Sequence, residues 1–430
     1  MNRRSFMKAS LAAAVAGAAA RSSDAAAAPS PRGNELIERA RQAALEVLKP
    51  SPKQLQHGLE LHKASLVFES YGFSPRAAID GAACAKAAAA GADARELEDL
   101  RNEMGAVRCV TDPAERAEYI AAWEAAGVTC IFQNAGGGQD PAGVMRRLAQ
   151  FTYVTDMFSE FVVRAATPDD VVAAKQRNKR CLYFSSNSVP LAGRWESLEG
   201  ELAFVRPFFQ LGMRMMHMTY NRRNMLGDGC AEPANGGLSD FGRAAVAEMN
   251  RVGVIPDVAH AGWQTSLETA RASTRPMVAS HTTCAGLHHH IRGKPDEVIK
   301  AIADTGGYIG ICAIGSFLGG KGDIRAMLDH VDYAVKHFGA ERVAIGTDIA
   351  YTSRNSTIEN KKVPAGLRSR PGWSSLWPPG SLAGPEHASL AWTNWPLFTV
   401  GMVQRGYSDA DIQKILGGNV LRVARAALKK

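Results

Sequence analysis

The chain has no hydrophobic run long enough to cross a membrane after its first 28 residues. A transmembrane helix needs about 20 consecutive apolar residues. The alanine-rich stretch near the N-terminus is too short to span comfortably, and no later segment of the 430 residues qualifies. We therefore expect a protein without a stable membrane anchor.

Several cofactor and partner signatures are also missing. The seven cysteines show no CxxC or zinc-ribbon spacing, and an odd number cannot all pair within one chain. The triple glycine at 136–138 lacks the GxGxxG order of a dinucleotide site. The net charge of +8 is spread along the chain, without a basic run interleaved with aromatics. These absences argue against a dinucleotide cofactor and against nucleic acid as a partner.

Residues 1–28 have the pattern of an export signal. Arg3 and Arg4 are followed by SFMK, an alanine-rich apolar core and Ala-x-Ala-like sites near residues 24 to 28. This pattern is typical of a twin-arginine signal, which carries folded proteins across the bacterial inner membrane. An ordinary secretory signal or an uncleaved anchor is the alternative. We expect the twin-arginine export machinery as a partner and a periplasmic location.

The remaining chain alternates short apolar strands with amphipathic helices. Four predicted strands between residues 251 and 348, RVGVIPDVAH, RPMVASH, YIGICAIG and ERVAIGTD, are separated by segments with helical spacing. Strands that alternate with helices predict a parallel sheet, and polar residues at successive strand ends are typical of a (β/α)8 barrel. We expect an α/β fold with a linker and N-terminal helix at 29–60. A single TIM-type barrel domain at 61–430 would carry inserted loops and C-terminal helices.

Nine segments are strand candidates, one more than such a barrel needs. Besides the four above, they are ASLVFES, GAVRCV, GVTCIFQN, KRCLYFSS and MRMMHMTY. One of the nine is therefore spurious or belongs to an added hairpin. The loop at 351–385 is rich in Ser, Pro, Gly and Trp and is expected to cover the pocket. The segment YSDADIQKILGGNVLRVARAAL predicts two helical pieces broken at Gly417 and Gly418.

Three polar residues end predicted strands in this region: His260, His281 and Asp348. At one rim of a barrel their side chains converge, and neutral imidazole is a usual ligand for zinc. Taken singly, each histidine has a simpler interpretation as a hydrogen-bonded core residue, and Asp348 as a helix cap. Together they favour a metal or catalytic site. Asp348 would either bind the metal or act as general base toward a water molecule.

Other histidines and one arginine complete the candidates. Arg292 has a planar guanidinium group that suits a substrate carboxylate. The consecutive residues 288–290 are all histidine, but neighbouring side chains point in different directions, so we interpret them as a surface loop. His217 falls within a predicted strand and is interpreted as a packed histidine.

Five segments also match a known family in order and spacing. They are LGMRMMHMTYNRRN, GGLSDFGRAAVAEMNRVGVIPDVAHAG, ASHTTCAGLHHHIRGKPDE, RVAIGTDIA and GYSDADIQKILGGNVLRVARAAL. From about residue 60 to its end, the chain resembles the membrane dipeptidase (renal dipeptidase) family of zinc peptidases, which are amidohydrolase-like barrels. The resemblance implies that His260 and His281 bind one zinc ion and that Asp348 handles the proton of the attacking water. It further implies that Arg292 receives the substrate carboxylate. Family members often form homodimers, so a homodimer is one expected assembly.

The chain departs from the family pattern in one half of the two-metal centre. The family's first strand ends in a His-x-Asp pair, whereas LVFESYGF has neither residue. Depending on register, Glu69 or Ser70 stands at the histidine position, and Tyr71 or Gly72 at the aspartate position. The bridging glutamate of the family corresponds to Gln133, whose neutral amide is a poor bridge between two cations. A histidine that polarises the substrate carbonyl corresponds to Tyr220, whose hydroxyl can donate to an oxyanion.

These departures imply a divergent member with one zinc ion instead of two. His260 and His281 would bind it, with Asp348, Gln133 or Glu69 completing the set of ligands. The first functional hypothesis is an exported hydrolase of a dipeptide or acylated amino acid that uses a metal-activated water. The second is a lyase or isomerase that tailors a peptide-derived metabolite with one metal or none. The third is a non-catalytic barrel that binds a peptide or cell-wall fragment.

Overall fold

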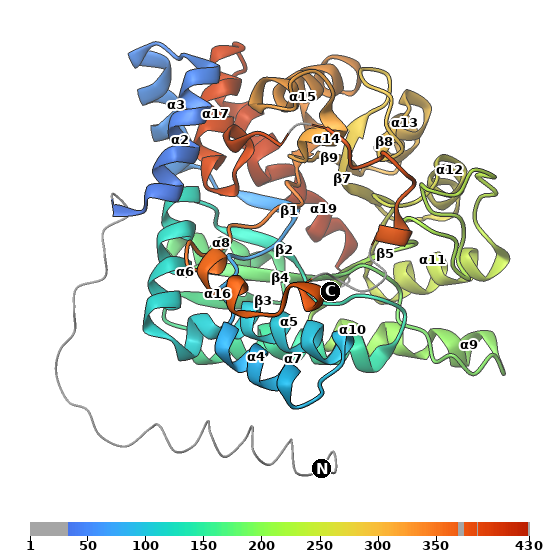
Figure 1. The fold of residues 1–430 in the computed structure, drawn as a ribbon. Helices are drawn as coiled ribbons and strands as arrows, with labels where there is room; N and C mark the ends of the chain where they lie inside the picture. Colours follow the sequence, from blue (N-terminus) through green and yellow to red (C-terminus); the bar gives the residue numbers. More distant parts are fainter. Residues whose placement is uncertain (1–32, 369–373, 385, 429–430) are drawn as a thin grey trace. The chain divides into compact units, whose positions relative to one another are not determined.

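The chain folds around a parallel sheet of eight strands (Figure 1). The computed structural model describes residues 33–368, 374–384 and 386–428, so the predicted export signal at 1–28 lies outside the described residues. The eight strands, in their order around the sheet, are β1 Phe68–Gly72, β2 Cys130–Asn134, β4 Arg180–Ser186, β5 Met213–His217, β6 Ile255–Asp257, β7 Val278–Cys284, β9 Tyr308–Ile311 and β10 Val343–Ile345. The backbone N–H of Asp348, just after β10, donates to the carbonyl of Tyr71 in β1 at 3.3 Å. This contact brings the two ends of the sheet together, and the expected (β/α)8 barrel is confirmed.

One of the nine strand predictions is wrong. Residues 105–110, GAVRCV, lie inside helix α5, Ala94–Thr111. The Asp93 side chain caps the first turn of this helix and Glu96 completes a capping box, so local hydrogen bonds favour the helix over a strand. Two short strands were not predicted. β3, Val162–Ala165, pairs with β4, and β8, Gly293–Lys294, pairs with β7, both outside the eight-strand path.

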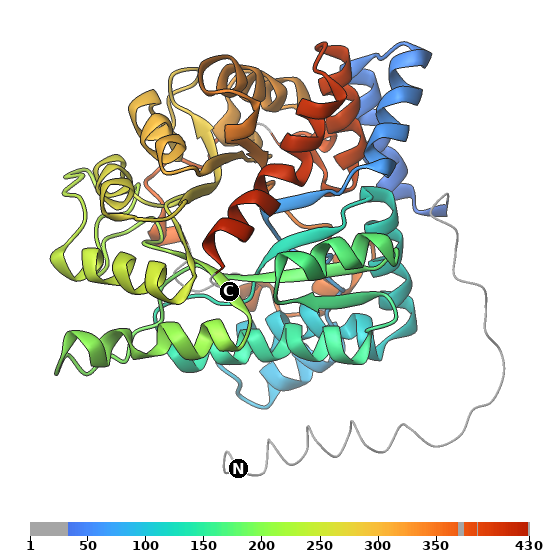
Figure 2. The same cartoon turned by 180° about the vertical axis from the view of Figure 1, so that it is seen from behind.

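Helices surround the barrel in both views (Figures 1 and 2). Where one helix was predicted at 29–60, the described residues there form α2 and begin α3. The α-helices are α2 Glu35–Leu48, α3 Pro52–Ala64, α4 Gly81–Ala89, α5, α6 Pro113–Ala126, α7 Pro141–Met157, α8 Pro168–Gln176, α9 Leu198–Glu201, α10 Val205–Gln210, α11 Asp240–Val252, α12 Trp263–Ala272, α13 Asp296–Asp304, α14 Gly315–Leu318, α15 Ile324–Phe338, α16 Ser356–Lys362, α17 Trp395–Gln404, α18 Asp409–Gln413 and α19 Asn419–Ala427. Shorter 3-10 turns span Leu202–Phe204, Ala340–Arg342, Ala365–Leu367, Ser374–Leu376, Ala388–Leu390 and Trp392–Asn394. Among the described residues, no helix is both long and apolar enough to cross a membrane.

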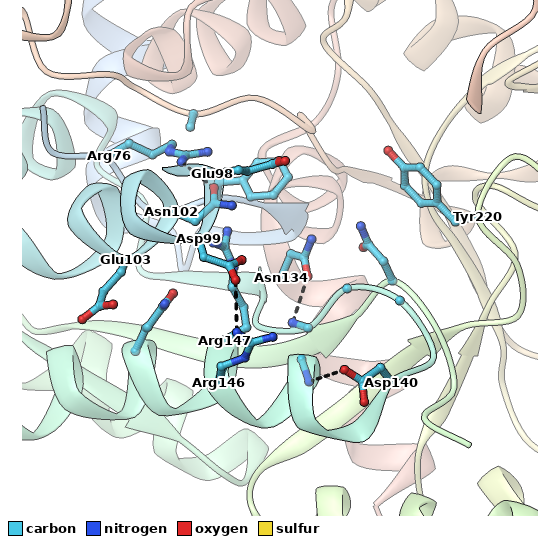
Figure 3. Close-up of a pocket in the computed structure, with 18 of the residues that line it drawn as sticks. Arg76, Glu98, Asp99, Asn102, Glu103, Asn134, Asp140, Arg146, Arg147 and Tyr220 are labelled. Atoms are coloured by element: carbon cyan, nitrogen blue, oxygen red, sulfur yellow. Dashed lines mark hydrogen bonds and ion pairs between the residues drawn. The ribbon is translucent and has the colours of Figure 1, made fainter. Parts of the chain in front are cut away.

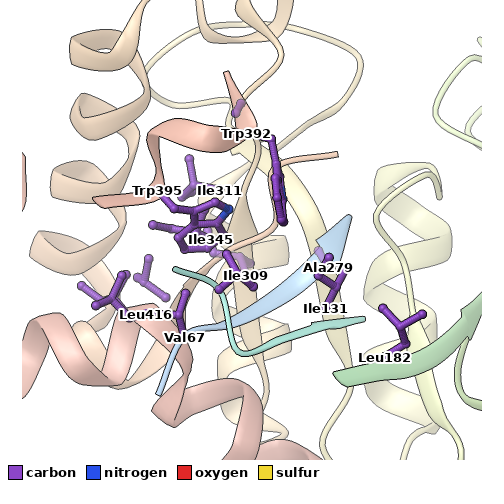
Figure 4. Close-up of a cluster of buried hydrophobic side chains, with 14 of the residues drawn as sticks. Val67, Ile131, Leu182, Ala279, Ile309, Ile311, Ile345, Trp392, Trp395 and Leu416 are labelled. Carbon is purple, nitrogen blue, oxygen red and sulfur yellow. The ribbon is translucent and has the colours of Figure 1, made fainter. Parts of the chain in front are cut away.

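Alternate residues of the strands face two different hydrophobic layers. Val67, Ile131 and Leu182 belong to the layer between the sheet and the helices, which also contains Trp392 (Figure 4). Their neighbours Phe68, Phe132 and Tyr183 belong to the cluster inside the barrel. This period of two is the geometry of a β-strand, and it fixes which polar side chains can reach the barrel interior.

The C-terminal helix closes the barrel end where the strands begin. The break predicted at the glycine pair is present, because a π-helical turn at Lys414–Gly418 joins α18 to α19 and Gly417 has a non-helical backbone. A Cβ atom on Gly417 would lie 2.4 Å from the Leu66 carbonyl oxygen, so only glycine allows this approach. Val420 and Val423 of α19 pack into the cluster inside the barrel. The opposite end, where the strands finish, is left for the site.

Candidate metal and catalytic site

A cavity of about 760 Å³ lies at the carboxyl ends of the strands. Its walls come from α5, the glycine loop at 136–138, the start of α7 and the segments that follow β1, β4, β5 and β10. Tyr220 lies across the cavity from the charged residues of α5 (Figure 3). The lining includes both cationic and anionic side chains: Arg76, Arg95, Arg146, Arg147, Glu98, Asp99, Glu103, Asp140 and Asp348. Two of these side chains, Arg146 and Asp99, form an ion pair at 3.1 Å.

The structure brings His260 and His281 together beside this cavity. His260 follows β6 and His281 lies within β7, and their Nε2 atoms are 2.9 Å apart. Both imidazoles are buried. Burial and, next, the charge of Arg292 lower the pKa of each histidine well below its usual 6.5, so neither imidazole favours an extra proton.

The hydrogen bonds on the far side of each ring determine which nitrogen carries the proton. His260 Nδ1 lies 2.7 Å from the Asn221 amide oxygen, which can only accept. His281 Nδ1 lies 2.8 Å from the Ser280 hydroxyl, whose own proton is donated to Asp257. Both Nδ1 atoms therefore carry the proton, and both Nε2 lone pairs face each other. Two lone pairs at this distance repel unless a cation lies between them, and an outer hydrogen bond of this kind is the usual support of a metal-binding histidine. The donor set fits a metal ion.

Asp348 stands at the boundary between the histidine pair and the cavity. Its Oδ2 lies 3.9 Å from His281 Nε2, and its side chain is 15% exposed. Its backbone φ of +58° is in the left-handed region, as is that of Asn221 at +53°. Such strained positions persist where the surrounding structure holds them, and they concentrate at functional sites. Burial raises the pKa of the Asp348 carboxyl to about 6, although the charge of Arg292 opposes the shift.

Arg292 is buried behind the histidines and does not line the cavity. Its Nη2 donates to the His281 carbonyl at 3.0 Å and its Nε donates to the Ala259 carbonyl at 3.3 Å. The guanidinium also lies over the ring of Phe317, 5.4 Å from its centroid. Arg292 thus ties together the two segments that carry the histidines. Its Nη1 has no hydrogen-bond partner among the described residues, and contact of Arg292 with a substrate carboxylate stays a prediction.

Glu69 and Gln133, predicted as further metal ligands, face the helix side of the sheet. Both Glu69 oxygens accept protein hydrogen bonds, one from the backbone and hydroxyl of Thr347 and the other from Trp392 Nε1 at 2.8 Å. Gln133 Oε1 accepts from the Ser74 backbone at 2.6 Å, and its Nε2 donates to the Asn134 carbonyl at 2.9 Å. The structure therefore gives both side chains other partners, and metal binding by either one stays a prediction.

The buried Glu69 carboxyl makes stability depend on pH. Burial raises its pKa from 4.5 to about 8, although hydrogen bonds from Thr347 and Trp392 oppose the shift. The folded state therefore holds a proton that the unfolded state releases near pH 4.5. This contribution to stability is fully present below that pH and is lost as the pH rises through 8. We expect Glu69→Gln to remove a slope of about 1.4 kcal/mol per pH unit across this range. Urea unfolding at pH 5 and pH 8 measures it, and parallel stability profiles for the two proteins would contradict it.

The first strand places an aromatic ring where the prediction had left the register open. The Tyr71 ring stacks on His281 with centroids 3.9 Å apart, and its hydroxyl donates to Asn187 Oδ1 at 2.5 Å. Tyr220 stacks on His260 at 4.2 Å. From β2, the side chain that lines the cavity is that of Asn134, the neighbour of Gln133. A one-residue difference of this kind follows from strand pleating, which the sequence pattern did not resolve.

Two residues near the histidine pair were missed from sequence. His217, interpreted as a packed mid-strand histidine, is the last residue of β5, and Asp257 is the last residue of β6. Both side chains are fully buried. Ligand atoms of His217, Asp257 and His281 all lie within 4.8 Å of one another. The sequence carried little signal for either residue, because both lie inside the longer predicted strands MRMMHMTY and RVGVIPDVAH, whereas the observed strands end at His217 and Asp257.

Comparison with known proteins gives a consistent set of similarities. The profile of membrane dipeptidase (peptidase family M19) matches residues 109–374. "Dipeptidase tcpJ" of Claviceps purpurea (strain 20.1) is 25% identical over 277 residues, which cover 63% of this chain and 57% of that protein. "Dipeptidase verJ" of Clonostachys rogersoniana is 28% identical over 222 residues, or 51% of this chain and 50% of that protein. The crystal structure of an amidohydrolase from Pseudomonas aeruginosa is 25% identical with a TM-score of 0.62, covering 86% of this chain and 98% of that one. The chain spans about half the length of the two curated relatives.

Proposed function

Because this chain belongs to the membrane dipeptidase family, we propose that it is a metal-dependent hydrolase of a small amide, either a dipeptide or an acylated amino acid. We further propose that the twin-arginine pathway exports it to the periplasm. The family assignment and the dipeptidase names of its relatives support the hydrolase proposal. The twin arginines and alanine-rich core at 1–28 support export.

The observation that carries the hydrolase proposal is the histidine pair. His260 and His281 direct their Nε2 lone pairs at each other across 2.9 Å, beside Asp348 at the edge of the cavity. These two histidines would hold one metal ion, and zinc is proposed because a neutral nitrogen and carboxylate set suits it. Such an ion supplies Lewis-acid activation of water and of the amide carbonyl.

The chain's own residues supply the remaining chemistry. Asp348 accepts a proton from the water and passes it to the leaving amine, and its pKa of about 6 suits a base near neutral pH. Tyr220 lines the cavity and stacks on His260, a position from which its hydroxyl can donate to the carbonyl oxygen. Arg292 would offer Nη1 to the substrate carboxylate.

Amine release from a panel of dipeptides and acylated amino acids tests this function directly. We expect at least one member to be hydrolysed. A chelator should abolish the reaction, because removal of the ion takes away several kcal/mol of transition-state stabilisation, about 10³-fold or more in rate. Adding zinc back should restore the activity. Turnover that persists undiminished in metal-free protein would contradict the proposal.

A lyase or isomerase on a peptide-derived metabolite is the second candidate. The observation that favours it is Tyr71, whose ring lies against His281 on the side of the first strand. Such an enzyme would release no amine from the panel. Its own reaction would depend on Tyr220, so Tyr220→Phe would reduce turnover of the metabolite, and no member of the dipeptide panel would be hydrolysed.

A further inference from the structure

A third histidine ring closes a triangle with the pair described above. The ring centroids of His217 lie 5.4 Å from His260 and 5.3 Å from His281, and the latter two are 4.9 Å apart. His217 comes from β5, His260 follows β6, and His281 comes from β7. Three neighbouring strands thus direct imidazoles toward one small volume inside the barrel.

His217 is buried without the hydrogen bonds that a buried histidine needs. It is fully buried; its Nδ1 has no hydrogen-bond partner among the described residues, and its Nε2 has only a 2.8 Å contact with Asp257 Oδ2 that does not meet hydrogen-bond geometry. An unsatisfied buried polar group is rare and costly, and an ion at the site is one of its ordinary explanations. His62 provides a contrast, because its Nδ1 contacts Thr399 Oγ1 at 2.8 Å and its Nε2 contacts the Ala126 carbonyl at 2.9 Å.

Asp257 beside His217 is held as an ionised carboxylate. Its Oδ1 accepts from the backbone N–H groups of Ala259 at 2.9 Å and Ser280 at 3.0 Å, and its Oδ2 accepts from the Ser280 hydroxyl. Several donors to one carboxylate favour the charged form. A fully buried negative charge requires positive charge nearby. The buried Lys294 acts on Asp257 through its charge, and the group in direct contact with the carboxylate is His217.

The contact between His217 and Asp257 resembles that of two ligands of one ion. His217 Nε2 lies 2.8 Å from Asp257 Oδ2, yet the contact lacks hydrogen-bond geometry. Two ligands of one ion approach each other closely without donating to each other. Ligand atoms of these two residues and His281 all lie within 4.8 Å. Histidine nitrogen with carboxylate oxygen is a donor set that zinc accepts.

The first strand offers no comparable ligand at this place. The Glu69 carboxylate faces the helix side and is bonded to Thr347 and Trp392. The Tyr71 ring fills the space against His281, and its hydroxyl is directed to Asn187. A ligand set that includes the two histidines must therefore be completed from other strands.

We propose that His217 and Asp257 complete the metal centre of this chain. The side chains that bind the ion then come from β5, β6 and β7, and none comes from β1. This inference rests on the metal-dependent function proposed above and names the ligands of that same centre. Asp348 then remains at the cavity edge as the proton-handling group. The proposal assigns a direct role to His217, which the sequence pattern had marked as a packing residue.

Metal binding by the full-length chain and its His217→Gln variant tests the proposal without relying on turnover. We expect one zinc equivalent per wild-type chain. The affinity of the variant should fall by more than about 100-fold, because loss of an outer-shell partner alone costs about 10- to 100-fold. The ligand-field spectrum of the cobalt-substituted protein should change in the variant. His62→Gln, which also alters a buried histidine, is the matched control and should leave both readouts unchanged.

Anomalous scattering from zinc-loaded wild-type crystals covers the case in which the variant fails to fold. We expect the ion within about 2.1 Å of a His217 nitrogen. An ion on His260 and His281 that leaves His217 beyond bonding distance would overturn the proposal, as would unchanged affinity in a folded His217→Gln variant. In either case the hydrolase function would stand if the dipeptide panel is turned over. If the ion binds His217 but no member of the dipeptide panel is hydrolysed, the proposed hydrolase function would be overturned and the proposed metal site would stand.

Discussion

Replacing His281 with alanine is expected to remove both the metal ion and the hydrolysis of the dipeptide panel. The His281 ring meets His260, Ser280, Tyr71 and Asp348, so its loss removes a central part of the site. A catalytic ion contributes several kcal/mol to transition-state stabilisation. At about 1.4 kcal/mol per factor of ten, kcat/KM should fall by about 10³- to 10⁵-fold. Steady-state kinetics and metal analysis of the same preparation measure both effects.

His289→Ala is the matched control for this substitution. His289 is exposed in the loop that was predicted to be a surface segment, so loss of its imidazole should leave metal content and kcat/KM near the wild-type values. Circular dichroism and thermal unfolding establish that the His281→Ala protein is folded. A folded His281→Ala variant that keeps its metal and hydrolyses the panel at the wild-type rate would rule out the proposed centre.

Asp348→Asn is expected to reduce kcat while the metal stays bound. Asparagine keeps the shape of the side chain and tolerates the left-handed backbone at this position, but it cannot accept a proton. Loss of a general base typically costs about 10²- to 10⁴-fold in rate. His260 and His281 remain in this variant, so metal content should match that of the wild type. That difference separates the role of Asp348 from the role of the histidines.

The pH profile adds a second readout for Asp348. A general base is active when deprotonated, so the wild-type rate should rise with pH through the pKa of the carboxyl. Burial raises that pKa to about 6, and a cation bound nearby would lower it. The midpoint of the increase in rate with pH should therefore lie at or below pH 6. This increase should be absent from the residual activity of Asp348→Asn. Asp140→Asn, in the wall of the same cavity, is the control because asparagine also caps helix α7. An increase that survives in Asp348→Asn would assign it to another group.

Much of this architecture could be predicted from local patterns. Apolar runs that alternate with amphipathic segments predicted the barrel, and eight of the nine strand candidates are strands. His260, His281 and Asp348 could be grouped because the carboxyl ends of parallel strands meet at one rim. The failure at 105–110 has a local cause, since the apolar residues there belong to a helix that begins upstream at the Asp93 and Glu96 capping box.

The directions of individual side chains could not be predicted in the same way. Glu69 and Gln133 occupy strands that reach the site, but both face the helices. The register irregularity of β1 lies between Glu69 and Gly72 and includes Tyr71, whose ring stacks on His281. A shift of one residue turns a strand side chain to the opposite face. The position of His217 beside Asp257 likewise depends on the pairing of β5 with β6, residues separated by 40 positions.

The sequence by itself therefore determined the fold class, the family resemblance and the rim residues, because each depends on periodicity or on motifs within short segments. Only the tertiary structure decided which side chains share the site. It placed Glu69 and Gln133 on the helix side of the sheet, Tyr71 against His281, and His217 in contact with Asp257 near the histidine pair. The physical reason is that strand register and pleating, fixed by packing between distant segments, orient each side chain toward the barrel or toward the helices.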